Sequence, residues 1–464
     1  MATSQIREIG RQEAATLPRV LGRFDALTVV VGSIIGSGIF LKPAAVAQSL
    51  DSFGLIIGVW IVVGLITLCG SLAVAELAAM LPHAGGPYVF LREAYGRLPA
   101  FLLGWTEFWV IRTGSLGALS AATTIYLSQL VPLGHQGQEI AAIGIVMFLC
   151  GINTVGTRWA ARVQNVTTTT KVAFLLVIIV LPFALGRAQG NLLLPLLPET
   201  YSPSLWKGLG AAMIAVLWPY DGWVHVSSVA EEIRNPQRNV PLALGLGMLI
   251  VIVLYVAANV AYHAVLPLDQ IRQSSAVAAD ACRALLGPIG GSLVAMGVMC
   301  STFGALNANV LTGPRMYFAM ARDGLLPDSL RRIHERYQTP ANAILLQGGW
   351  AIVLIVIAYA WKGDPREAFD VLTNYVIFGA SVFYALAVAA VFVLRRRRPE
   401  LPRPYRTWGY PVVPALYLVF FGAALASLLI VTPRESAAGT ALILAGMAFY
   451  IVMERRRRRS HAGQ

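Results

Sequence analysis

The sequence VGSIIGSGIFLKP, residues 31–43, carries the strongest local signal in this chain. It lies inside an apolar segment at 24–49 that is long enough to cross a membrane, which takes about 20 residues. The middle of this segment holds Gly32, Gly36 and Gly38, and glycine weakens a helix by about 1 kcal/mol relative to alanine. We therefore predict a membrane-spanning helix that is interrupted near its centre.

An interruption at membrane depth leaves backbone groups that lipid cannot satisfy, so these groups must face a protein cavity or a ligand. The amides of Ser37, Gly38 and Ile39 would begin a second half-helix, and the positive end of a helix suits a carboxylate. The carbonyls before the interruption would suit an ammonium group. The stretch therefore predicts a site for both charged groups of an α-amino acid.

The composition indicates a polytopic membrane protein. Of the 464 residues, 57% are hydrophobic and 13% are charged, whereas a soluble domain carries about 25% charged residues. Residues 1–20 lack the apolar core of a signal peptide, so we expect no cleaved signal. We expect one all-α domain over 1–464, with about twelve transmembrane helices and short connections. The apolar segments lie near 24–49, 54–80, 99–131, 139–156, 164–185, 205–232, 241–265, 287–321, 340–360, 370–394, 411–432 and 437–453.

The charged residues indicate the orientation. With the N-terminus inside, most of the 36 Lys and Arg residues fall in the tails and in the inner connections, so the positive-inside rule predicts that both termini are cytoplasmic. The arginine clusters at 395–398 and 455–459 lie beside spans and suit anionic lipid, so we expect no nucleic acid partner. The four cysteines and six histidines are scattered without metal or disulfide spacing, so we expect no cofactor, no metal and no catalytic residue.

The sequence WPYDGW at 218–223 places a proline, a glycine and a carboxylate inside the sixth apolar segment. Because this segment follows the first by five, a copy of spans 1–5 at 6–10 would be inverted in the membrane. Paired interruptions in two such halves indicate the central site of a transporter. Either interruption alone could be a simple kink, and the halves show no plain sequence repeat, so the inference depends on span number and position.

Three stretches resemble the amino acid–polyamine–organocation (APC) transporters, and most closely their L-type branch: VGSIIGSGIFLKP at 31–43, WPYDGWVHVSSVAEEIRNPQRNVP at 218–241 and STFGALNANVLTGPRMYFAMARDGLLP at 301–327. The L-type branch includes bacterial exchangers and the light chains of animal heteromeric transporters, and the resemblance covers essentially the whole chain. It implies a LeuT-like fold of five plus five inverted helices, with discontinuous helices 1 and 6. The expected parts are a cytoplasmic N-terminal tail at 1–23, a first repeat at 24–185, a second repeat at 205–394, two peripheral helices at 411–453 and a basic C-terminal tail at 454–464.

The resemblance also implies the site residues. Backbone amides of Ser37 and Gly38 would bind the substrate carboxylate. Carbonyls of Ile34, Trp218 and Asp221 would bind the α-ammonium, and the Trp218 ring would cover the substrate. Because backbone groups bind, we expect a change of the Ser37 side chain to harm transport less than added bulk at Gly38. The expected substrate-binding residues are Ile34, Gly36, Ser37, Gly38 and Ile39 in the first interruption and Trp218, Asp221 and Gly222 in the second.

Lys171 lies in the fifth apolar segment after four threonines, and two interpretations of it are open. Its side chain could snorkel to the inner interface. The resemblance instead implies that Lys171 points toward the first interruption and takes the place of the sodium ion of related sodium-coupled transporters, with Ser301 and Thr302 as partners. This second interpretation predicts sodium independence, and proton coupling through Lys171 stays open.

Other charged residues inside the apolar segments need partners, because an unpaired charge in a membrane is expensive. We expect Arg112 to pair with Glu107 or Glu76 in a structural role. Asp221 could meet a substrate ammonium or a basic side chain, or it could be satisfied within the interruption. The two glutamates at 231–232 end the sixth segment, where pairing with arginine or lysine would form a gate.

These observations predict sodium-independent transport of neutral L-amino acids across a bacterial plasma membrane by alternating access, as an exchanger. The alternatives are a proton-coupled symporter and an amino acid sensor without transport, although sensors usually carry long cytoplasmic extensions and these tails are short. An enzyme is not expected, because no nucleophile–base set, phosphate loop or metal cluster appears. The connection at 131–139 lacks the cysteine that joins animal light chains to a heavy chain, so we expect no disulfide-linked partner. The expected partners are the amino acid substrate and membrane lipid.

Overall fold

The computed structural model describes residues 16–198, 203–362, 365–431 and 433–462. Within these ranges the chain is helical, and its single β pairing is a parallel bridge between Leu21 and Ile233. The helices before residue 200 are α2 (Arg23–Ile34), α3 (Gly38–Leu41), α4 (Pro43–Ser49), α5 (Phe53–Met80), α6 (Pro87–Tyr95), α7 (Arg97–Thr106), the π-helix η1 (Glu107–Ile111), α8 (Arg112–Leu127), α9 (His135–Val155), α10 (Thr157–Ala184) and the 3-10 helix η2 (Gly190–Leu193).

The helices after residue 200 include two further 3-10 helices, η3 and η4. They are α11 (Pro203–Leu217), η3 (Trp223–Glu232), α12 (Pro236–His263), α13 (Leu268–Gln273), α14 (Val277–Leu286), α15 (Pro288–Thr312), α16 (Pro314–Arg322), η4 (Asp328–Arg331), α17 (Ala341–Lys362), α18 (Pro365–Arg397), α19 (Val412–Val431) and α20 (Pro433–Ala462).

Over the described residues, ten helices are long and apolar enough to cross a membrane, by length and composition. The expected all-α membrane fold is therefore confirmed. These spans are Arg23–Leu41, Phe53–Met80, His135–Val155, Thr157–Ala184, Pro236–His263, Pro288–Arg322, Ala341–Trp361, Val371–Arg397, Val412–Ile430 and Pro433–Arg455.

The two remaining expected spans are interrupted. In the segment expected at 99–131, α7 and α8 are joined by the π-helix η1, a local widening of the helix. In the segment expected at 205–232, α11 ends at Leu217 and the chain continues as the 3-10 helix η3. Because no single α-helix in these segments has the length of a span, twelve transmembrane helices stay a prediction.

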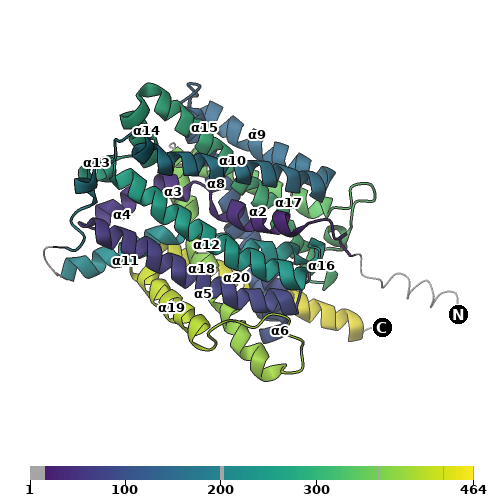
Figure 1. Ribbon diagram of the computed structural model, residues 1–464. Helices are drawn as coiled ribbons and strands as arrows, with labels where there is room; N and C mark the ends of the chain where they lie inside the picture. Colours follow the sequence, from purple (N-terminus) through teal and green to yellow (C-terminus); the bar gives the residue numbers. More distant parts are fainter. Residues whose placement is uncertain (1–15, 199–202, 363–364, 432, 463–464) are drawn as a thin grey trace.

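Closely packed helices surround the first interrupted helix. α12 lies along α5 and α2, and α10 lies beside α2 and α12 (Figure 1). The approach of α12 to α2 requires a glycine, because a β-carbon on Gly247 would stand 2.6 Å from Cγ1 of Val30. Small residues allow such approaches between membrane helices. α15 packs against α2, η3 and α8, so helices from both halves of the chain surround the two interruptions.

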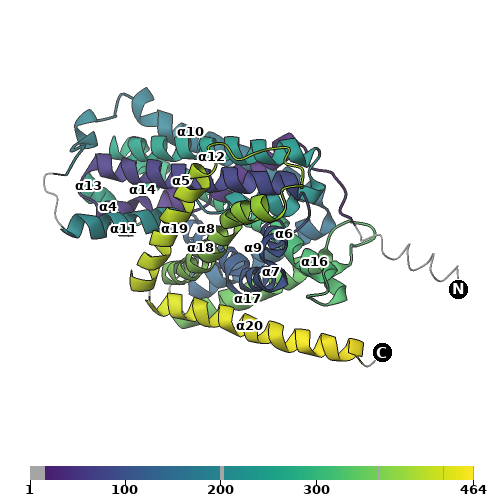
Figure 2. The ribbon, with the colours of Figure 1, turned by 90° about the horizontal axis from the view of Figure 1, so that it is seen from below.

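Helices α19 and α20 lie at the edge of the bundle, and Figure 2 shows α20 running along one side. Apolar side chains of both are exposed, with Val419 of α19 73% and Leu444 of α20 56% accessible, as suits helices that face lipid. The start of α2 and the end of α20 lie at the same end of the molecule in both views (Figures 1 and 2). The side of the membrane that this end faces stays a prediction.

Candidate functional site

The first interruption lies at residues 35–37, between α2 and α3. Ile35 ends α2 with extended backbone angles of φ −73° and ψ 93°. The amides of Gly38 and Ile39 come before the helical hydrogen bonds of α3, because the first amides of any helix have no intrahelical partner. Ser37 and Ile39 are fully buried, so these backbone groups lie inside the protein. The interruption is present where the glycine pattern predicts it.

The second interruption is a turn at residues 218–222, between α11 and η3. The amide of Asp221 donates to the carbonyl of Trp218 at 3.1 Å, which forms the turn. Gly222 adopts a φ of +102°, a conformation that glycine tolerates best. Beyond this glycine the chain winds as a 3-10 helix rather than as an α-helix.

The two interruptions are in direct contact. A β-carbon on Gly38 would stand 2.6 Å from Cα of Pro219. A β-carbon on Gly222 would stand 2.8 Å from the carbonyl oxygen of Ser33. Each of these contacts meets backbone rather than a flexible side chain, so both positions require glycine.

Two side chains also link the interruptions. Tyr255 of α12 places its hydroxyl 3.1 Å from the carbonyl oxygen of Ile34 and 3.1 Å from that of Pro219. The indole Nε1 of Trp218 donates to the hydroxyl of Ser37 at 3.4 Å. Sequence reasoning missed Tyr255, because a tyrosine in an apolar segment is an ordinary packing residue.

A small cavity lies between the interruptions, with about 20 Å³ of room for a water-sized sphere. This is roughly the room that one water molecule needs, so the helices surround little free space in this structure. All of the expected substrate-binding residues line the cavity except Ile39, which is buried beside it at the start of α3. The sequence did not predict the other lining residues, because they have the pattern of ordinary core positions. They are Ser33, Ser115, Leu119, His225 and Asn309.

Lys171 of α10 lies against the first interruption and is fully buried. Its Nζ donates to the carbonyl oxygens of Gly32 at 2.8 Å, Ile35 at 2.6 Å and Ser301 at 3.1 Å. An ammonium group has three hydrogens, so these three carbonyls use all of its donors. The snorkelling interpretation is therefore wrong, and the lysine points toward the interruption.

Ser301 and Thr302 of α15 act differently from the expectation. Lys171 meets the backbone carbonyl of Ser301 rather than its hydroxyl, because that hydroxyl donates to the carbonyl of Gly36 at 3.0 Å. The Thr302 hydroxyl lies 2.7 Å from the hydroxyl of Thr123. Thr302 also donates to the carbonyl of Val298 within α15 at 3.0 Å, so its hydrogen bonds join α15 to α8 and to itself and do not involve Lys171.

Trp218 lines the cavity, as expected of a residue of the second interruption. It meets Phe369 of α18 edge to face, with 5.9 Å between the ring centroids. The ammonium of Lys42, between α3 and α4, lies 5.4 Å over the Phe369 ring. Phe369 is only 4% exposed, so its contact with Trp218 is buried.

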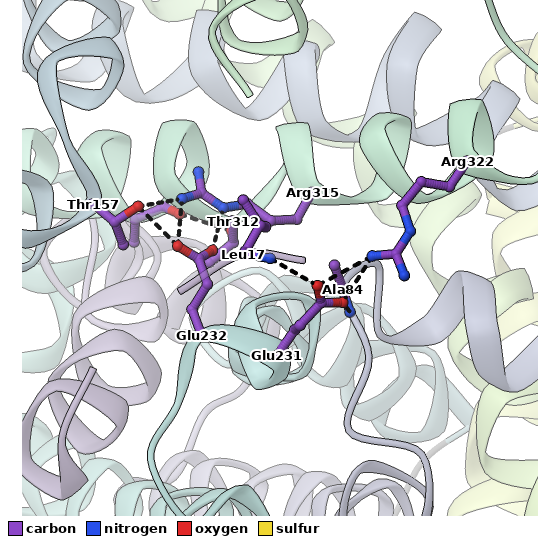
Figure 3. Close-up of polar contacts among 9 residues, drawn as sticks. Leu17, Ala84, Thr157, Glu231, Glu232, Thr312, Arg315 and Arg322 are labelled. Carbon is purple, nitrogen blue, oxygen red and sulfur yellow. Dashed lines mark hydrogen bonds and ion pairs between the residues drawn. The ribbon is translucent and has the colours of Figure 1, made fainter. Parts of the chain in front are cut away.

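Ion pairs lie at the end of η3, as Figure 3 shows. Glu232 accepts a hydrogen bond from Arg315 of α16 at 2.7 Å, and both side chains are fully buried. The hydroxyl of Thr157 donates to Glu232 at 2.8 Å. Glu231 pairs with Arg322 at 3.0 Å. The expected pairing of these two carboxylates with arginines is confirmed.

The N-terminal segment is held by the same two glutamates. The carboxylate of Glu231 accepts the backbone amides of Leu17 at 3.0 Å and Ala84 at 2.9 Å (Figure 3). The amide of Leu21 donates to the carbonyl of Glu232 at 2.9 Å. The end of η3 therefore forms hydrogen bonds with three parts of the chain: the N-terminal segment, the connection between α5 and α6, and α16.

Arg112 follows the π-helix η1 and is 1% exposed. Its Nε donates to Glu107 at 2.9 Å, and its Nη1 lies 3.4 Å from Oδ1 of Asn309. Glu76 pairs with Arg395 at 2.6 Å instead. Of the two expected partners of Arg112, Glu107 is confirmed and Glu76 is wrong.

The chemistry of the site suits a zwitterion. Its polar groups are backbone amides and carbonyls, serine hydroxyls, the imidazole of His225, the carboxamide of Asn309 and the carboxylate of Asp221. Among the described residues, no group of three His, Cys, Asp or Glu side chains could hold a metal ion.

Membrane helices with two interruptions around a closed polar cavity define a transporter of a small polar solute. The family model for amino acid permeases matches residues 21–453, almost the entire chain. The protein belongs to this amino acid permease family, within the APC superfamily.

The chain is similar to curated amino acid transporters along nearly its whole length. It is 33% identical over 444 residues to the serine/threonine exchanger SteT of Bacillus subtilis. This alignment covers 95% of this chain and 98% of SteT. It is 32% identical over 459 residues to the human b(0,+)-type amino acid transporter 1, covering 96% and 90% of the two chains. It is 32% identical over 450 residues to the mouse Asc-type amino acid transporter 1, covering 95% and 82%. The expected class, an amino acid transporter rather than an enzyme, is confirmed at the level of the family.

Proposed function

We propose that this protein exchanges neutral L-amino acids across the plasma membrane and does not require sodium. The observation that carries the proposal is the position of Lys171. Its ammonium donates to carbonyl oxygens of Gly32, Ile35 and Ser301, and a sodium ion at this place would need the same oxygens as ligands. A fixed positive charge therefore replaces a cation that would otherwise be bound and released.

The substrate binds between the two interruptions. Its carboxylate accepts hydrogen bonds from the amides of Ser37 and Gly38, at the positive end of α3. Its α-ammonium donates to the carbonyls of Ile34, Trp218 and Asp221. A carbonyl oxygen has two lone pairs, so a carbonyl that already accepts one bond can accept the ammonium as well.

Transport requires that the two closures open in turn. One closure is the contact of Trp218 with Phe369 on the side of α3 and α4. The other is the group of ion pairs at Glu231 and Glu232. The two halves, five helices each and inverted, would move against one another around the fixed site, with α19 and α20 at the periphery. The positive-inside rule places the end with the ion pairs, and both termini, in the cytoplasm of a bacterium.

The similarity to SteT supports exchange and a neutral substrate. SteT is a serine/threonine exchanger, and the alignment covers 98% of its length. Serine and threonine are neutral, and a cavity lined by one carboxylate, that of Asp221, is compatible with them.

Counterflow in proteoliposomes tests the proposal. The vesicles are loaded with unlabelled alanine, and labelled alanine is added outside with or without sodium and with or without a proton gradient. Uptake that needs internal amino acid but neither ion supports the exchanger. Uptake into empty vesicles driven by protons would make the protein a symporter, and binding without any flux would make it a sensor. Vesicles without protein provide the background.

A further inference from the structure

Four polar side chains line the cavity but have no part in holding the charged groups of the proposed substrate. They belong to Ser33, Ser115, His225 and Asn309. Their hydrogen-bonding groups indicate which substrate side chains they could bind.

Two of these four side chains are satisfied within the protein. The hydroxyl of Ser115 donates to the carbonyl of Ile111 at 2.7 Å. The amide nitrogen of Asn309 donates to the carbonyl of Ala305 at 3.0 Å, and its oxygen faces Arg112 at 3.4 Å. Neither side chain needs a partner from the cavity.

The other two side chains carry buried polar atoms without a hydrogen-bond partner in the described part of the chain. These atoms are Oγ of Ser33 and Nδ1 of His225, whose residues are 8% and 3% exposed. A buried polar atom that lacks a partner is costly, and native proteins keep few of them without a reason. Because both residues line the substrate cavity, a substrate side chain can supply the missing partner.

We propose that His225, together with Ser33, recognises the substrate's side chain, and that the preferred substrates are small neutral amino acids with a hydroxyl or carboxamide group. This inference rests on the proposed transport function and specifies its substrate class. A neutral imidazole and a hydroxyl can each donate and accept, as can the hydroxyl or carboxamide of a substrate. Trp218 and Leu119 complete the lining of this small cavity, which limits the size of the side chain.

Threonine and valine provide a sharp test, because they have nearly the same shape and differ by a hydroxyl. A site that hydrogen-bonds this group discriminates against the analogue that lacks it. In proteoliposomes that exchange labelled alanine, threonine should compete at concentrations at least about tenfold lower than valine, as the loss of one hydrogen bond implies.

Variants assign the preference to His225. His225→Phe should remove the preference for threonine over valine, measured as the ratio of their competition against the alanine exchange that the variant retains. His225→Asn, which places an amide near the position of Nδ1, should restore part of the preference, and Ser33→Ala should reduce it. Ser115→Ala is the matched control, because its hydroxyl lines the same cavity but is bonded to Ile111, and it should keep the preference.

The outcomes separate this inference from the proposed function. Full preference for threonine in His225→Phe would overturn the inference and leave amino acid exchange intact. A wild-type preference for lysine or arginine would also overturn it, because recognition would then belong to the carboxylate of Asp221. Absence of any amino acid exchange or binding in the wild type would overturn the proposed function instead. If His225→Phe does not fold, equal competition by threonine and valine in the wild type still refutes the inference.

Discussion

Gly38 and Pro219 lie so close that a β-carbon on Gly38 would stand 2.6 Å from the Cα atom of Pro219. Backbone meets backbone here, so neither residue can yield by rotating a side chain. The contact joins the first interruption to the second at the edge of the cavity. The geometry of the substrate site therefore depends directly on the relative position of the helices that carry Gly38 and Pro219.

A graded set of substitutions tests this contact. Gly38→Ala should lower exchange at least about 100-fold, because the added methyl group displaces α3 from Pro219 and small displacements in a site have effects of this size. Gly36→Ala should cost less, since its β-carbon would meet the movable Leu119 side chain at 3.3 Å. Ser37→Ala should cost least. The measurement is the initial rate of labelled alanine exchange at equal protein content. Equal losses for Gly38→Ala and Ser37→Ala would show that the Ser37 side chain itself binds substrate.

Removal of the Lys171 ammonium should change the response to sodium. Lys171→Met should lower exchange at least about 100-fold, because buried carbonyls lose a charged donor and such hydrogen bonds contribute about 1.5–3 kcal/mol each. Lys171→Ala leaves space for a cation, so sodium should stimulate its residual exchange. The rates are compared in sodium and choline buffers, with the exposed Lys207→Ala as control. Wild-type rates without sodium in both Lys171 variants would refute the role of Lys171 as a replacement for the ion.

Weakening the ion pairs at the end of η3 should open that end of the site. Ser227 of η3 is fully buried, so Ser227→Cys in a background without the native cysteines reports opening by its reaction with a membrane-impermeant thiol reagent. Glu231→Gln removes the charge that pairs with Arg322 and should raise the labelling rate about tenfold, the effect of roughly 1.4 kcal/mol. The control is Asp328→Asn, because the Asp328–Arg331 pair is exposed and such pairs contribute about 0–1 kcal/mol. Equal labelling of the two variants would show that Glu231 does not restrain η3.

The buried pair of Arg112 and Glu107 should act through stability. Arg112→Met leaves the Glu107 carboxylate buried without its partner and should destabilise the protein by about 3–5 kcal/mol. The double variant Arg112→Met/Glu107→Gln should recover most of this loss, because no buried charge remains. Melting temperatures in detergent measure both effects. A changed order of substrate competition in Arg112→Met, without a change in melting temperature, would instead assign Arg112 to substrate binding.

Features that depend on one segment alone could be predicted from the sequence. Glycine and proline weaken a helix, so the glycines around Gly38 indicate the first interruption, and Pro219 with Gly222 indicates the second. A charge in an apolar segment must find a partner, so the sequence predicts buried partners for Lys171 and Arg112, and both have them. Their expected sets of partners were correct only in part, since Glu76, the alternative for Arg112, binds Arg395.

Contacts between ordinary residues of distant segments could not be predicted. Tyr255 and Phe369 are common types in membrane helices, and only the fold brings them to the interruptions. The bond from the backbone amide of Leu17 to Glu231 has no side-chain signature at Leu17 at all. The partners of Thr302 depend on the register of α15 against α8 and α10, which the sequence pattern does not define.

The hydroxyl of Tyr255 has one hydrogen but faces two carbonyl oxygens, those of Ile34 and Pro219. At any instant it can donate to only one of them, so the other carbonyl needs a further donor. In the proposed binding mode, the ammonium of an amino acid would bring three hydrogens to this place and supply that donor. The substrate would then stabilise the arrangement in which the two interruptions lie together.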